Sequence, residues 1–373
     1  MISSFLQERI DSGDFPSAVY LVAEKGEIVL HEALGFAVLE PERIAASVDT
    51  IYDLASLTKV LVTGLLTAKL ADSKECDVDA ILNSHPHEYF SLNRLTARSL
   101  LTHTTGLPPW KPFYLLTTDP AARSEVIGRL AVEPPARDVV YSDLNFLLLE
   151  ELLLERVGCS LDRAARREIF EPLGLRNTLF NPGAALRDDI AANERGNEFE
   201  RQMCIEQGYL SSEPQPTDSN SGSDVFRDYQ IWGEVHDGNA YFMGGVAGHA
   251  GLFSTATEVC KIALQFLPNY TTLLKPETCE LFRTNFTPGM SEARSFGFQL
   301  ASTKDSSAGT KMSPESFGHN GFTGTSLWVD PTKDRIFVLL TNRTHHRALP
   351  FANINAVRRR FHELAIDFLD GNI

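Results

Sequence analysis

Two β-prone runs joined by a short polar segment near the start of the chain predict a β-hairpin. Residues 17–23 and 28–33 are β-prone runs, and Gly26 lies between them where a tight turn favours glycine. An amphipathic segment over residues 1–10 precedes the hairpin and is typical of a helix. Residues 57 to about 71 are largely apolar and follow the small and polar residues 53–56, which predicts a helix that starts next to Ser56.

The middle of the chain, residues 77–265, predicts a mainly helical domain. Helical patterns such as those over residues 144–157 and 161–169 alternate there with long turn-rich connections. Between residues 206 and 234 the sequence becomes polar, and residues 211–223 contain too few apolar side chains to pack. We expect a mobile surface loop at 206–234, with a lid over a binding site as the alternative interpretation.

The last third of the chain predicts strands again and then a closing helix. The strand patterns cover residues 295–300, 326–330 and 335–341, and a helical pattern covers residues 353–369. Pairing these strands with the N-terminal hairpin gives one antiparallel sheet built from both chain ends and flanked by helices. The predicted fold is therefore α+β, with residues 1–76 and 266–373 in the sheet domain and residues 77–265 in a second, mainly helical lobe.

Composition and charge limit the partners that the protein could have. At 43% hydrophobic residues over 373 positions, the chain can bury a sizeable core. Its formal charge of −15 predicts a surface that repels nucleic acid and anionic membranes. The one concentrated basic run, Arg358-Arg359-Arg360, falls in the C-terminal helical pattern, where we expect it on the solvated face.

The cysteines and the apolar segments favour a soluble cytoplasmic protein. The five cysteines are odd in number and scattered, unlike a disulfide framework, so free thiols in a reducing compartment are expected. The N-terminal residues lack a charged leader followed by an unbroken apolar stretch, so we expect no export signal. The best apolar run, residues 60–68, is too short to span a bilayer.

The first candidate for chemistry is the pair Ser56 and Lys59. A serine hydroxyl is a weak nucleophile and needs a base within hydrogen-bond reach. Residues three apart lie on the same face of a helix, so Lys59 can approach the Ser56 hydroxyl. To accept a proton, Lys59 must be neutral part of the time, which predicts a pKa lowered by burial or by a nearby positive charge. The alternative is a helix start with an exposed lysine.

Two further motifs carry candidate residues. Tyr141 stands in Tyr141-Ser142-Asp143 at the head of an apolar helical pattern, and a phenol beside a lysine can act as a proton shuttle. The structural alternative is a packed tyrosine followed by a helix cap. Residues 318–325, with three glycines and His319, lead into a strand, which suggests that a ligand approaches that backbone closely and that an N–H group there can stabilise an oxyanion. The alternative for His319 is a histidine that only satisfies its hydrogen bonds within a turn.

These three motifs, in this order, resemble those of the serine β-lactamase and penicillin-binding protein superfamily, in its class C β-lactamase-like and esterase branch. Further stretches agree with the resemblance, and together they span about residues 15 to 365: residues 100–108, 244–254 and 339–343. The resemblance implies that Ser56 is the acylated nucleophile and that Lys59 and Tyr141 share the acid and base work. It also implies an oxyanion hole formed by the N–H groups of Ser56 and Phe322.

The resemblance places His319, followed by Asn320 and Gly321, where the family carries a Lys-Thr-Gly motif, so His319, Gly321, Phe322 and Asp143 are expected to bind substrate. Two residues depart from the family pattern. Asp143 stands where class C β-lactamases have asparagine, and a carboxylate cannot donate hydrogen bonds. His319 replaces a permanent cation by a group that is mostly neutral near pH 7, which weakens any grip on a substrate carboxylate.

The expected function is a serine hydrolase that forms an acyl-enzyme on an ester, amide or β-lactam bond of a small-molecule or peptide substrate. The alternative is a catalytically idle member of the same fold that binds peptides or acts as a structural partner. An α/β-hydrolase is disfavoured because the chain has no Gly-x-Ser-x-Gly elbow. His236, Asp237, His249 and Cys204 show no recognised ligand spacing, so we expect neither a metal nor another cofactor. The oligomeric state is left open.

Overall fold

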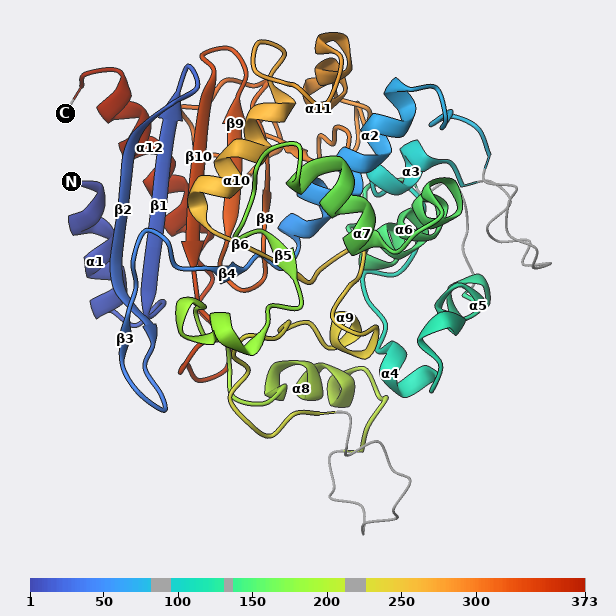
Figure 1. The fold of residues 1–373 in the computed structure, drawn as a ribbon, viewed down its shortest axis with the longest axis horizontal. Helices are drawn as coiled ribbons and strands as arrows, with labels where there is room; N and C mark the ends of the chain where they lie inside the picture. The colour runs from blue at the N-terminus through green and yellow to red at the C-terminus, as the bar shows by residue number, and fades with distance from the viewer. Residues whose placement is uncertain (82–94, 131–136, 212–225, 373) are drawn as a thin grey trace.

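A seven-stranded antiparallel sheet forms one side of the molecule in the computed structural model, which describes residues 1–81, 95–130, 137–211 and 226–372 (Figure 1). The strand order is β3-β2-β1-β10-β9-β8-β7. The sheet comprises β1 (Ser17–Glu24), β2 (Glu27–Val38), β3 (Ile44–Ala45), β7 (Gln299–Leu300), β8 (Phe317–Asn320), β9 (Ser326–Asp330) and β10 (Arg335–Thr341). Both chain ends supply strands, as β1 pairs with β10, which confirms the predicted α+β fold.

Alternation along the central strands sends side chains into two separate cores. Tyr20 and Val22 of β1 join the core formed with α1 (Ile2–Asp11) and α12 (Asn355–Leu369). Their neighbours Val19 and Leu21 point to the opposite core, where α10 (Ala256–Ala263) crosses the sheet (Figure 1). This period of two is what a sheet covered on both faces requires.

The predicted hairpin is confirmed: β1 and β2 pair across Lys25 and Gly26, which have φ values of 53° and 81°.

The other helices lie beside the sheet (Figure 1). They are α2 (Leu65–Asp72), α3 (Ala97–Leu101), α4 (Phe113–Leu116), α5 (Arg123–Gly128), α6 (Asp143–Val157), α7 (Leu161–Ala165), α8 (Glu198–Glu206), α9 (Gly238–Phe242) and α11 (Glu280–Arg283). A small sheet of β4 (Tyr52–Asp53), β6 (Leu252–Ser254) and β5 (Leu179–Phe180) joins the segment before Ser56 to the middle of the chain. The predicted domain boundaries stay a prediction.

Three expectations differ from the structure in detail. The strand expected over residues 295–300 shrinks to Gln299–Leu300, because Ser295 N donates to Phe298 O and closes a turn. Part of the mobile loop expected at 206–234 falls on residues 212–225, which lie outside the described residues, and near its end Ile231 and Trp232 are buried. Arg358 is also buried and not solvated, since its guanidinium donates to the carbonyl oxygens of Gly321 and Thr325.

None of the helices in the described ranges combines the length and apolar character that a membrane crossing requires.

Candidate active site

Ser56 is presented by a constrained turn. Ala55, just before it, has a φ of +46°, a conformation that costs a residue with a Cβ some free energy unless its surroundings hold it. Two hydrogen bonds do so: Ala55 N donates to Asp53 Oδ1 at 2.9 Å, and Thr58 Oγ1 donates to Ala55 O at 2.7 Å. The predicted helix continues from Lys59 as a π-helical turn, Lys59–Gly64, and then as α2. Ser56 therefore lies at the helix start, as predicted.

Lys59 is fully buried directly behind Ser56. Its Nζ donates to Ser56 Oγ at 2.9 Å and to His249 O at 3.1 Å, and it forms an ion pair with Asp143 Oδ1 at 2.7 Å. Burial alone lowers the pKa of Lys59, but the Asp143 carboxylate and Tyr141 outweigh it, so the pKa is raised. The lowered pKa expected from the sequence is therefore wrong for the substrate-free site, and the reason is a carboxylate at the start of α6.

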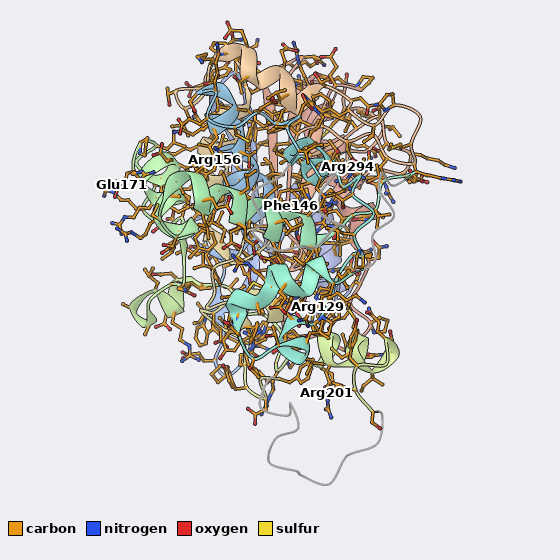
Figure 2. The ribbon with its side chains drawn as sticks, turned by 90° about the vertical axis from the view of Figure 1, so that its right-hand side faces the viewer. Arg129, Phe146, Arg156, Glu171, Arg201 and Arg294 are labelled. Carbon is orange, nitrogen blue, oxygen red and sulfur yellow. The ribbon has the colours of Figure 1, made fainter. Side chains whose placement is uncertain are left out.

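Tyr141 lines the same cavity as Ser56 and is surrounded by cations and histidines. The Lys59 ammonium lies 5.2 Å from its ring centroid and the Arg294 guanidinium carbon 5.5 Å from it. Tyr141 also contributes to the raised pKa of Lys59. In Figure 2, α6, which contains the labelled Phe146 and Arg156, faces the viewer, and Arg294 is labelled too. The structure thus brings together the serine, amine and phenol that the sequence analysis singled out.

The turn between β8 and β9 is fastened to the segment that carries Ser56. Thr323 Oγ1 donates to Asp53 O at 2.7 Å, and Thr325 Oγ1 donates to Leu54 O at 3.0 Å. A Cβ on Gly321 would lie 2.5 Å from Leu54 O, so only glycine allows this approach. Within the described residues, the backbone N–H groups of Ser56 and Phe322 donate to no protein acceptor. Two free N–H donors beside a nucleophile are suited to an oxyanion.

His319 is a neutral hydrogen-bond acceptor in this site. Burial first, and then the charges of Lys59 and Arg294, hold its pKa well below the ordinary value. Its Nδ1–H donates to Asn320 O at 2.9 Å, which leaves Nε2 as a buried acceptor without a partner among the described residues. His319 therefore supplies no positive charge, as the sequence analysis expected. The cations that line the cavity are Arg294, Arg343 and Arg358.

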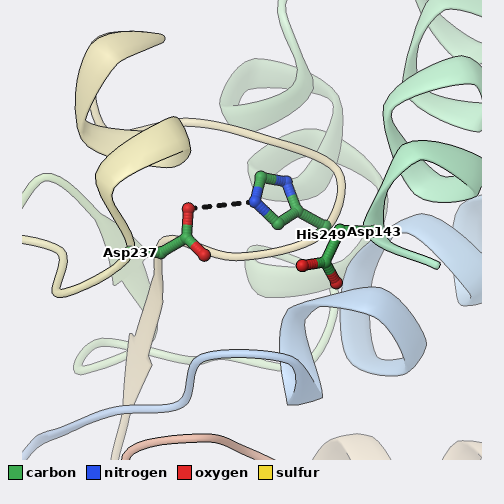
Figure 3. A group of neighbouring side chains, drawn as sticks. All are labelled: Asp143, Asp237 and His249. Atoms are coloured by element: carbon green, nitrogen blue, oxygen red, sulfur yellow. Dashed lines mark hydrogen bonds and ion pairs between the residues drawn. The ribbon is translucent and has the colours of Figure 1, made fainter. Parts of the chain in front are cut away.

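Asp143, Asp237 and His249 form a cluster whose ligand-type atoms all lie within 4.8 Å of one another (Figure 3). His249 Nε2 lies 3.0 Å from Asp237 Oδ1. Burial opposes charge on both groups, but their mutual attraction prevails: it raises the pKa of His249 and lowers that of Asp237. The Lys59 ammonium, in contact with Asp143 and with the His249 carbonyl, provides the positive charge that the carboxylates need. The cluster thus acts as the electrostatic support of Lys59.

His103 is a residue to which the sequence analysis gave no role. Its ring stacks on Tyr141 with centroids 4.6 Å apart. Its Nδ1 accepts from Ser142 N at 3.0 Å and from the Asn145 amide at 3.1 Å, and its φ is +57°. The position of His103 in one of the stretches that carry the family resemblance was the available signal, but only the fold places it against Tyr141.

We expect His103→Ala to lower kcat/KM for an ester substrate by roughly tenfold, because a misplaced catalytic group loses that much or more. His103→Asn should recover most of the activity, since its side-chain oxygen can replace Nδ1 as the acceptor and asparagine tolerates a positive φ. The measurement is steady-state hydrolysis alongside thermal unfolding. Equal loss in both variants at equal stability would contradict a role for the Nδ1 acceptor in placing Tyr141.

One cavity of about 750 Å³ lies over this site. Ser56, Tyr141 and His319 line it, together with residues of the turn between β8 and β9 and of the start of α12. A cavity of this size holds a small molecule or the end of a peptide.

Comparison with known proteins finds relatives of this chain and solved structures of the same fold. A curated relative from Escherichia coli (strain K12), provisionally named D-alanyl-D-alanine carboxypeptidase, is 29% identical over 373 residues, covering 91% of this chain and 81% of its own. A class C beta-lactamase structure from Rhodobacter sphaeroides superposes with a TM-score of 0.70 at 16% identity, covering 99% of both chains. EstCE1, described as a hydrolase with promiscuous acyltransferase activity, gives a TM-score of 0.72 at 20% identity over 97% of each chain.

The two structures show a shared fold, and the family model described as Beta-lactamase matches residues 2–358, nearly the whole chain. The chain therefore belongs to the beta-lactamase family.

Proposed function

We propose that this protein is a serine hydrolase that forms an acyl-enzyme on Ser56. The observation that carries the proposal is the 2.9 Å hydrogen bond between the fully buried Lys59 Nζ and Ser56 Oγ. A lysine pays a large desolvation cost to lie there, and a merely structural helix start needs no such group.

In the proposed reaction, Ser56 Oγ attacks the substrate carbonyl carbon while its proton passes to the Lys59–Tyr141 pair. The carbonyl oxygen becomes an oxyanion held by the N–H groups of Ser56 and Phe322. Tyr141 then gives a proton to the leaving atom as its bond to the carbonyl carbon breaks. Water repeats the sequence in the second half, attacking the ester of Ser56 and releasing the acid and the free serine.

Lys59 must lose its proton before it can accept one from Ser56. In the substrate-free site the ammonium is favoured by Asp143, so only a small fraction is neutral near pH 7. Activity is therefore expected to rise toward alkaline pH.

The cations of the cavity favour substrates that carry a carboxylate. Arg343 and Arg358 bond to backbone carbonyls or to Asn355, and neither pairs with a carboxylate among the described residues. Burial, followed by the charge of Arg343, lowers the pKa of Arg358 to about 9, and burial lowers that of Arg343 to about 10. A substrate carboxylate would offset this desolvation. Peptides ending in D-alanine, suggested by the name of the Escherichia coli relative, carry a carboxylate on the leaving group, and Arg294, which lies over the Tyr141 ring, is the cavity cation placed to meet it.

The decisive test is covalent labelling followed by a substrate panel. A fluorophosphonate should add one adduct per chain, located by peptide mapping on Ser56, and protein unfolded in urea should not react. The panel contains nitrocefin, short-chain p-nitrophenyl esters and a D-alanyl-D-alanine peptide, each of which reports one activity. A folded protein that takes no label and hydrolyses none of the panel would support the idle, peptide-binding alternative instead.

We also propose a cytoplasmic location. All five cysteines are free, which suits a reducing compartment.

A further inference from the structure

The lining of the cavity has two chemically different parts, which we call the Tyr141 end and the Phe322 end after the residues that they contain. At one end, the Tyr141 ring contacts His319, with centroids 5.8 Å apart, and faces Arg294. At the other end, the Phe322 ring contacts Phe199 at 4.7 Å and Phe351 at 6.1 Å. Both ends line the same cavity, with Ser56 in its wall.

The Phe322 end is built from three phenylalanines that come from separate elements. Phe199 lies at the start of α8, Phe322 in the turn between β8 and β9, and Phe351 just before α12. Phe199 and Phe351 also stack on each other at 5.7 Å. All three are only half-buried, although each lines the cavity, and the half-buried Met203 adjoins them. Apolar side chains left open inside a cavity are typical of a ligand site, and methionine adapts to ligands of varied shape.

The backbone of Phe322 is held still while its ring faces the cavity. Arg343 Nε donates to Phe322 O at 2.7 Å, and its guanidinium carbon lies 4.8 Å from the ring centroid. The His236 ring stacks on the Phe322 ring, with centroids 5.5 Å apart. The same residue thus offers a free N–H for an oxyanion and a fixed ring beside it.

The polarity of the two ends fits the two halves of a substrate. In the proposed function, Tyr141 protonates the leaving group, so the leaving group lies at the Tyr141 end, among Arg294, Glu292 and Gln299. The acyl group then extends from the oxyanion hole toward the phenylalanines. We propose that the Phe322 end is a subsite for an aromatic or large apolar acyl group, an inference that rests on the proposed function and specifies its substrate class.

Two esters with the same leaving group test the subsite. The wild-type protein should hydrolyse p-nitrophenyl phenylacetate with a kcat/KM at least about tenfold higher than p-nitrophenyl acetate, the scale of discrimination in an apolar pocket. Phe199→Ala should reduce this ratio by about fivefold or more, because it removes one wall of the subsite. Phe36→Ala, a half-buried phenylalanine on β2 away from the cavity, is the matched control and should leave the ratio unchanged.

The result separates this inference from the proposed function. If both esters are hydrolysed but the wild-type ratio is near one, or Phe199→Ala does not move it, the subsite is wrong and the hydrolase stands. If neither ester is hydrolysed, the labelling test and the full substrate panel decide the proposed function, and calorimetric titration with phenylacetate decides the subsite alone. Binding to the wild type at least about fivefold tighter than to Phe199→Ala supports it, and equal affinity overturns it.

Discussion

Replacing Ser56 by alanine should abolish both fluorophosphonate labelling and turnover of any substrate that the wild-type protein hydrolyses. The change removes one oxygen, and the constraints on the turn remain, because the bonds at Ala55 come from Asp53 and Thr58. Within the described residues, the Lys59 amine donates to the Ser56 hydroxyl and to His249 O and pairs with the Asp143 carboxylate, so Ser56 is the serine that it serves. Loss of a covalent nucleophile removes the acyl-enzyme route altogether.

The matched control is Ser73→Ala, at the C-terminal end of α2, the helix that continues from the Ser56 turn. Its hydroxyl donates to Leu70 O at 3.2 Å and is remote from the cavity lining. Labelling stoichiometry by intact-mass spectrometry and kcat/KM should match the wild type. A Ser56→Ala protein that still gains one adduct at full rate would place the nucleophile elsewhere and remove the proposed mechanism.

Much of the fold could be predicted because its signals are local. Neighbouring residues alone indicate the hairpin around Gly26, the apolar strands β1 and β10, and the long helix α6. Pairing the two chain ends required only that their strands share one sheet. The predicted strand at 295–300 was wrong over most of its length because the tight turn that Ser295 closes with Phe298 prevails over the β-prone composition.

The proximity of Ser56 and Lys59 could likewise be predicted from the sequence, because residues three apart at a helix start lie on the same face. The protonation state of Lys59 could not, because it depends on Asp143, which arrives from another helix 84 positions later in the chain (143 minus 59). The solvated face expected for Arg358 was wrong for a similar reason. The carbonyl groups that receive its guanidinium belong to the β8–β9 turn, and only the folded chain brings α12 against them.

The contact between Lys59 and Asp143 leads to a prediction about pH. If neutral Lys59 is the base, kcat/KM of the wild type should rise with pH until the raised pKa of Lys59 is passed. Asp143→Asn keeps the shape of the side chain but removes the charge at 2.7 Å, so the pKa of Lys59 should fall from its raised position. We expect the rising limb of the profile to move to lower pH by about one to three units, the usual effect of one close opposite charge.

The measurement is kcat/KM for one ester from pH 5 to 10 in the wild type, Asp143→Asn and Asp138→Asn. Asp138 is exposed on the same segment and serves as the matched control. Its Oδ1 accepts hydrogen bonds from Val139 N and Ser291 N. Its profile should overlay that of the wild type. A profile of Asp143→Asn that also overlays the wild type, at comparable stability, would mean that the titration of Lys59 does not limit the reaction, and the base would have to be assigned to Tyr141 alone.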